Sequence, residues 1–207
     1  MSSLKSDDRY LRHELARLCQ GDILRDIEVA EWAGPVLQIE GGEGELTIRR
    51  RQLQYAVVMS QECDLYQDQQ NRSNAQKNQD KYLHSVLVVP AYPALTLKQG
   101  THLQGLKVTC ETLGGDRWKQ ILRNGTERYH HLPEWPSLQV PELVLDFKHF
   151  LTSPREDLLQ LAKGGAYLAS LGQLFRERLS QRFANFLARI ALPDLNEENQ
   201  DSQKATG

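Results

Sequence analysis

The chain has 207 residues, of which 40% are hydrophobic and 25% are charged, and its formal net charge is −2 at pH 7. This composition is typical of a globular protein with one packed domain. Proteins that cover long nucleic acid usually carry a basic excess, so the charge argues against a large non-specific phosphate footprint but not against a local basic patch.

No apolar run approaches the roughly 18 residues that cross a bilayer. Residues 1–8 also lack the apolar segment of a signal peptide, so we expect a cytoplasmic protein without membrane contact. Cys19, Cys63 and Cys110 are widely spaced and form no CxxC pair, which argues against a disulfide framework or a zinc ribbon. A zinc site built from Cys63, Cys110 and His130 has no spacing signature, so no metal and no cofactor are expected.

The first element in chain order is an expected N-terminal helix within residues 1–20. Asp7 or Asp8 can cap it, and leucines follow at helical spacing. Residues 21–150 then show strand-like runs between Gly- and Pro-rich turns. We expect these strands at Ile23–Trp32, Val36–Ile39, Leu46–Arg51, Tyr55–Ser60, Leu83–Tyr92, Lys107–Thr112, Trp118–Leu122, Arg128–Leu132 and Leu143–Phe147.

Residues 66–82 interrupt these runs with Gln, Asn, Asp and Lys and almost no apolar side chains. A core cannot be built from such a segment, so we expect a mobile surface loop of the kind that often carries a binding function.

The hydrophobic period changes after residue 150. Ser153-Pro154-Arg155-Glu156 has the pattern of a capping box and predicts a helix to about Lys163. A longer helix is expected over Ala166–Ile190. Residues 151–193 would then form a helical extension, followed by a disordered tail over 194–207.

Many short strands without alternating helices indicate an antiparallel barrel or a strongly curled sheet. Three short motifs, at Gly21–Leu24, Tyr55–Ser60 and Val88–Ala91, resemble strand motifs of the MazF/PemK/CcdB family of toxin ribonucleases and gyrase poisons. This resemblance covers residues 21–92. It implies an antiparallel SH3-like barrel over residues 21–150, here with extra hairpins and two C-terminal helices.

The sequence departs from that family at one important position. The ribonuclease members carry an Arg just before a Pro, and this Arg stabilises the scissile phosphate; the matching dipeptide here is Gln54-Tyr55. Arg49, Arg50 and Arg51 lie a few residues upstream and are candidates for a displaced cation. A family of uncharacterised bacterial proteins, which supplies no function, is also similar at Ser60–Leu65, Arg128–Pro133, Asp146–Phe150 and Leu179–Pro193.

Polar side chains gather where the strand Tyr55–Ser60 ends. Metal-free RNA cleavage needs a base, an acid and a cation, and we take Ser60, Asp64 and Arg50 as the catalytic candidates. Cys63 is either a nucleophile activated by a nearby His or a small buried hydrophobe, and Asp64 is either a base or a turn cap. Candidates for binding RNA or a partner are Arg49, Arg51, Gln61, Glu62, Cys63, His130, Arg178 and Arg182.

Arg178 and Arg182 share one face of the expected long helix. That face is either solvated, or bound to RNA or an acidic partner, or part of a homodimer.

Two functions remain open. One is a toxin-like or defence-associated barrel that binds RNA and cleaves it without metal. The other is a non-catalytic module that binds a protein partner, such as an antitoxin or a defence-operon protein, in a bacterial defence or signalling system.

Overall fold

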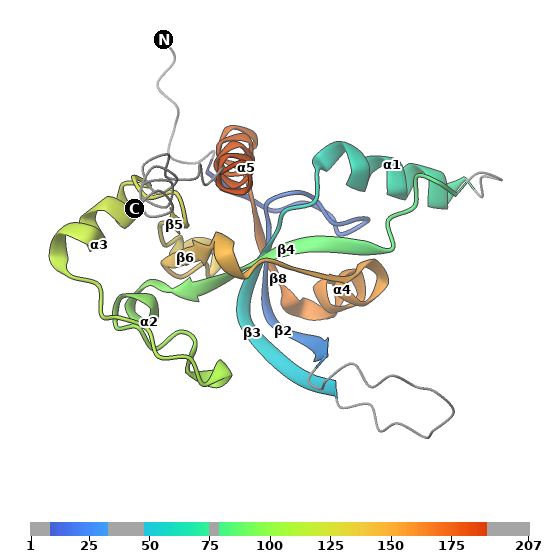
Figure 1. Ribbon diagram of the computed structural model, residues 1–207. Coiled ribbons are helices and arrows are strands. Elements are labelled where there is room, and N and C mark those ends of the chain that lie inside the picture. Colours follow the sequence, from blue (N-terminus) through green and yellow to red (C-terminus); the bar gives the residue numbers. More distant parts are fainter. Residues whose placement is uncertain (1–8, 33–47, 75–78, 190–207) are drawn as a thin grey trace, which may run out of the picture.

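The computed structural model describes residues 9–32, 48–74 and 79–189 (Figure 1). The strands are β1 (Tyr10–Leu11), β2 (Asp22–Trp32), β3 (Ile48–Val58), β4 (Ser85–Pro93), β5 (Tyr129–Leu132), β6 (Leu143–Asp146), β7 (Leu151–Pro154) and β8 (Tyr167–Leu171). The α-helices are α1 (Glu62–Ser73), α2 (Ala94–Lys98), α3 (Gly115–Leu122), α4 (Arg155–Leu161) and α5 (Gln173–Leu187). None of these helices is long and apolar enough to span a membrane.

The strands form one antiparallel sheet in the order β1-β8-β2-β3-β4-β6-β5, and β7 also pairs with β4. The expected neighbours β2, β3 and β4 are adjacent, with Ile23 opposite Val57 and Val57 opposite Val89. The mainly β class with helices is therefore confirmed. Within the described residues, the outer strands β1 and β5 do not meet, so the sheet stays open instead of closing into a barrel.

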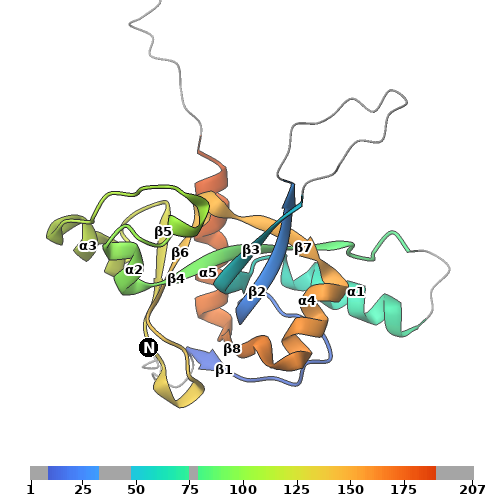
Figure 2. The ribbon, with the colours of Figure 1, turned by 90° about the horizontal axis from the view of Figure 1, so that it is seen from below.

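Both faces of the sheet are covered, because successive side chains of a strand point to opposite sides. Val57 belongs to a buried cluster with Phe183 and Phe186 of α5. Its neighbour Val58 belongs to a second cluster with Leu158 of α4. Figures 1 and 2 show α1 and α4 together on one side of the molecule and α2 and α3 on the other.

Two predictions about the ends of the domain are wrong. Residues 9–20 contain no helix; Tyr10 instead pairs with Leu171 of β8 and donates its hydroxyl to the carbonyl of Pro133 at 2.7 Å. The helix expected over Ala166–Ile190 begins only at Gln173, since the apolar run before it is β8, which lies inside the sheet between β1 and β2. The C-terminal part is thus built into the sheet and is no separate extension.

The expected hairpins after β4 are also wrong. Lys107–Thr112 is not a strand, and Trp118–Leu122 belongs to α3, which starts after Gly114. A helix is favoured there because it buries Ile121 in a third cluster with Leu97 of α2. Asn124, which has a φ of 56°, follows the end of this helix, and its N–H donates to the carbonyl of Ile121 at 2.8 Å.

The helix α4 occurs close to its predicted place, but its start differs. Ser153 lies in β7 and does not cap the helix; the N–H of Arg155 donates to the carbonyl of His84 at 3.0 Å. A π-helical turn, η5 (Ala162–Ala166), follows the helix and contains Gly165, whose φ of 106° suits glycine. The predicted strand Val36–Ile39 and the tail 194–207 lie outside the described residues.

Candidate functional site

A pocket of about 370 Å³ opens where β4 turns away from β3 into α2. β3 pairs with β4 only from Tyr55 to Val58, so the stretch 50–54 borders the space that the following segment encloses. That segment includes a 3₁₀ turn, η2 (Gln104–Leu106). The polar residues that line the pocket are Arg50, Arg51, Gln52, Gln54, Tyr92, Thr96, Thr101 and His102.

Among the described residues that line the pocket, two are arginines and none is a carboxylate, so this lining favours an anionic group. Arg51 donates from Nη2 to the hydroxyl of Tyr92 at 3.2 Å. Burial raises the pKa of Tyr92 to about 12, so this hydroxyl keeps its proton at neutral pH. Arg50 is more exposed and pairs with Glu28 of β2 at 2.9 Å, which leaves it at the rim.

His102 is the unusual side chain of this pocket. Both of its ring nitrogens are buried and have no hydrogen-bond partner in the described part of the chain. Its ring meets Tyr92 edge-on, with the centroids 4.9 Å apart. Burial lowers the pKa of His102, so the ring is neutral near pH 7 and offers one donor and one acceptor. An unpaired buried polar group costs about 1–3 kcal/mol, and a ligand recovers this cost if the imidazole turns toward the pocket to bond with it.

The strand-end candidates lie elsewhere. Ser60 follows Arg50 by ten residues along β3 and just beyond it, a path of roughly 30 Å. Its Oγ accepts the N–H of Leu87 at 2.8 Å, which fastens two strand ends. Asp64 is exposed on the first turn of α1, together with Cys63. The expected catalytic set Ser60, Asp64 and Arg50 is therefore not assembled in one place.

Glu62 bonds to other parts of the protein instead of pointing into a free site. Its carboxylate accepts the N–H of Gln20 at 2.8 Å, contacts Arg17 and lies 3.5 Å from Arg176. These contacts join the start of α1 to the N-terminal segment and to α5. Gln61, just before the helix, is exposed.

His130, a candidate for binding RNA or a partner, lies inside the protein. The side chain is buried, and burial together with the charges of Arg182 and Arg178 lowers its pKa to about 3. Arg182 is occupied by His130 and by backbone carbonyls, whereas Arg178 is exposed. Arg49 lies in β3, in the same strand as the pocket residues.

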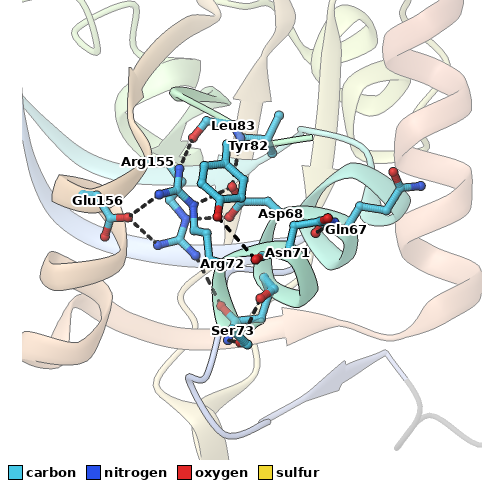
Figure 3. Close-up of polar contacts among 10 residues, drawn as sticks. Gln67, Asp68, Asn71, Arg72, Ser73, Tyr82, Leu83, Arg155 and Glu156 are labelled. Atoms are coloured by element: carbon cyan, nitrogen blue, oxygen red, sulfur yellow. Dashed lines mark hydrogen bonds and ion pairs between the residues drawn. The ribbon is translucent and has the colours of Figure 1, made fainter. Parts of the chain in front are cut away.

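The expected mobile loop over 66–82 is wrong for most of its length, because α1 continues through Ser73. Asp68 explains the helix: its buried carboxylate accepts from Arg155 at 2.8 Å, from Arg72 at 2.7 Å and from the N–H of Leu83 at 2.8 Å. Figure 3 shows these groups converging between α1 and α4. Residues 75–78 lie outside the described residues.

Arg50 and Arg51 were site candidates from the sequence, whereas Tyr92 and His102 were not. Tyr92 lies at the end of an expected strand. Its hydroxyl draws attention only in the structure, where it accepts a hydrogen bond from Arg51. His102 stands alone in a turn without a motif, and only the path from α2 to η2 places it beside Tyr92. No protein-family model matches this chain, and neither a curated protein nor a solved structure matches it significantly.

Proposed function

We propose that this chain binds single-stranded RNA, and that the pocket beside β3 holds one nucleotide of it. The observation that carries the proposal is the described part of the pocket's lining, which includes Arg50, Arg51 and a His102 without hydrogen-bond partners but no carboxylate. Arginine binds phosphate through two parallel N–H groups, and it is the side chain best suited to this task. The family resemblance of residues 21–92 points to the same ligand class.

Size and chemistry agree with a nucleotide. A volume of about 370 Å³ lies within the usual range of small-ligand sites, which is about 300–1,000 Å³. Proteins that read single-stranded RNA place bases against aromatic rings and bond to their edges. Tyr92 and His102 provide rings, while Gln52, Gln54 and Thr101 provide neutral donors and acceptors.

The proposal is that the chain binds RNA. Whether it also cleaves RNA is tested on the same RNA after long incubation. Metal-free cleavage requires a proton acceptor for the 2′-hydroxyl, a proton donor for the leaving 5′-oxygen and a cation for the phosphate. In this pocket a neutral His102 is the acceptor, Arg51 is the cation, and water is the donor. Asp64 has no part in this scheme, because it lies on α1 away from the pocket lining.

The test is fluorescence anisotropy with a labelled eight-nucleotide RNA and the matching DNA, in EDTA, at several salt concentrations. Arg51→Gln should weaken RNA binding and lower the salt slope by about 0.7, the value for one lost contact to a single strand. Arg25→Gln is the matched control, since Arg25 is an exposed strand arginine outside this pocket. Equal binding by the wild type and Arg51→Gln would overturn the proposal. Intact RNA after long incubation would limit the function to binding.

One observation favours the alternative of a protein-binding module. Residues 50–54 of β3 face the pocket without pairing to β4, and an extended peptide can add itself to such an edge. A peptide ligand would depend on backbone bonding and apolar side chains, so its binding would change little with salt. A salt-independent partner that competes for the pocket would therefore favour this second function.

A further inference from the structure

A second group of reactive side chains lies on the N-terminal side of β2, away from the RNA pocket. His13, Cys19 and Asp22 bring one imidazole nitrogen, one thiol and one carboxylate oxygen within 4.8 Å of one another. Asp22 is fully buried at the start of β2, and its Oδ2 accepts the N–H of Cys19 at 2.7 Å. The turn between them contains Gly21, whose φ of 87° suits glycine and brings the chain back toward Cys19.

The hydrogen bonds of His13 fix how its ring is oriented. Nδ1 lies 2.8 Å from the carbonyl oxygen of Glu14, and a carbonyl can only accept, so Nδ1 carries a proton. Nε2 lies 2.9 Å from Oδ1 of Asp22. In the neutral ring the Nε2 lone pair then faces a carboxylate, and only a positive centre between them makes the contact favourable. Either a second proton or a metal ion can supply that centre.

The surrounding groups hold the carboxylate and the imidazole in place. Ser170 of β8 donates its hydroxyl to Oδ1 of Asp22, and Tyr167 lies 2.9 Å from the same Ser170 oxygen. The Tyr167 hydroxyl also accepts the N–H of His13 at 3.2 Å. Outer partners of this kind are common around metal ligands, where a backbone carbonyl fixes the histidine tautomer and a hydroxyl orients the acid.

We propose that His13 Nε2, Cys19 Sγ and Asp22 Oδ1 bind a zinc-type divalent ion, with water as the fourth ligand. A mixed nitrogen, sulfur and oxygen set suits zinc, whereas magnesium and calcium prefer oxygen alone. Tetrahedral zinc bonds to nitrogen and oxygen at about 2.0–2.1 Å, which places a nitrogen and an oxygen ligand about 3.3 Å apart. The 2.9 Å contact of His13 and Asp22 therefore widens by about 0.4 Å on binding, a change that side-chain rotation can supply.

The chain offers matched controls for the thiol. Cys63 is exposed on α1 and Cys110 lies in the segment before α3, and neither belongs to this group. Cobalt(II) is the probe, because a thiolate ligand gives it a near-ultraviolet charge-transfer band. The wild type, Cys63→Ser and Cys110→Ser should each bind one equivalent and show the band, and Cys19→Ser should lose it.

Two further measurements keep the result independent of folding. Circular dichroism verifies that each variant is folded, and excess zinc should raise the melting temperature of the wild type and of Cys63→Ser but not that of Cys19→Ser. Ser170→Ala removes an outer partner only and should weaken cobalt binding 10–100-fold. Absence of the band in the wild type, or its loss in Cys63→Ser with retention in Cys19→Ser, would overturn the proposal. Neither result bears on RNA binding, which is measured in EDTA.

Discussion

Arg182 of α5 donates its Nε–H to Nδ1 of His130 on β5 at 3.0 Å. The rest of the guanidinium donates to the carbonyls of Asn124 at 2.6 Å, Thr126 at 2.6 Å and Tyr129 at 2.9 Å. A single side chain thus fastens α5 to the strand and turn beside it. The Nε–H bond also fixes the tautomer of His130, whose proton must lie on Nε2.

Arg182→Met tests this structural role. Methionine retains much of the apolar stem but leaves several carbonyls and His130 without their donor, so the free energy of unfolding should fall by about 2–4 kcal/mol. Arg178→Met is the control, because Arg178 is exposed on the same helix and should change stability by about 0.5 kcal/mol at most. Urea unfolding of both variants measures the difference. Equal stabilities would show that Arg182 is not a structural anchor.

The buried His130 predicts a loss of stability in mild acid. Its pKa falls from 6.5 to about 3 on folding, so the unfolded chain binds more protons between these values and stability rises with pH across that window. The contribution is complete above pH 6.5 and is lost as the pH falls toward 3. Between pH 7 and pH 5 this effect amounts to about 2 kcal/mol.

His130→Gln removes this titration while keeping an acceptor for Arg182. The variant should lose less stability between pH 7 and pH 5 than the wild type does, as measured by urea unfolding at each pH. Asp146 does not interfere: burial alone would raise its pKa, but Arg128 and His149 outweigh it and lower the pKa from 3.8 to about 2. The ionisation of Asp146 therefore changes the stability only below about pH 4. Parallel pH profiles for wild type and variant would contradict the prediction.

The sheet centre was predictable because its signal is local. Val57, Val58, Val88 and Val89 lie in apolar, β-branched runs that suit a strand buried on both faces. The β8 strand was mistaken for helix, since Leu168 and Leu171 fit a helical period as well as a strand and only pairing with β1 and β2 decides between them.

The errors about α1 and the site have a different cause. Asp68 and its partner Arg155 are separated by 87 residues in the sequence, so a short stretch of sequence around either residue does not predict their contact. Likewise, Arg51 was recognisable in the sequence as a cation, but its hydrogen-bond partner Tyr92 lies on another strand. His102 lies in an irregular segment, and local helix and strand propensities do not determine the path of such a segment.

The Asp68–Arg155 pair gives a direct test of how α1 is held. Asp68→Asn removes the buried counter-charge of Arg155, which then keeps only the exposed Glu156 among the described residues, and should cost about 3–5 kcal/mol in unfolding free energy. Arg155→Met alone should also be costly, and the double variant should lose at least about 1 kcal/mol less than the sum. Asp64→Asn, exposed on the same helix, should be nearly neutral. Strict additivity of the two buried changes would show that the pair is not coupled.

His102→Leu should separate stability from binding. Leucine has a similar volume and removes two buried nitrogens that lack partners, so the variant should be more stable than the wild type by about 1 kcal/mol. RNA affinity should fall in the same variant, because the neutral imidazole is lost from the pocket. A site group retained at a cost in stability is expected to behave in this way.

Thermal unfolding and RNA anisotropy on one preparation of His102→Leu measure both effects. Arg25→Gln, outside the pocket, should change neither quantity by a comparable amount. If His102→Leu were less stable than the wild type, the imidazole would have a structural partner after all, and its burial would be a matter of packing. If the variant were more stable but bound RNA unchanged, His102 would lie beside the ligand without bonding to it, and Arg51 alone would have to account for recognition in the pocket.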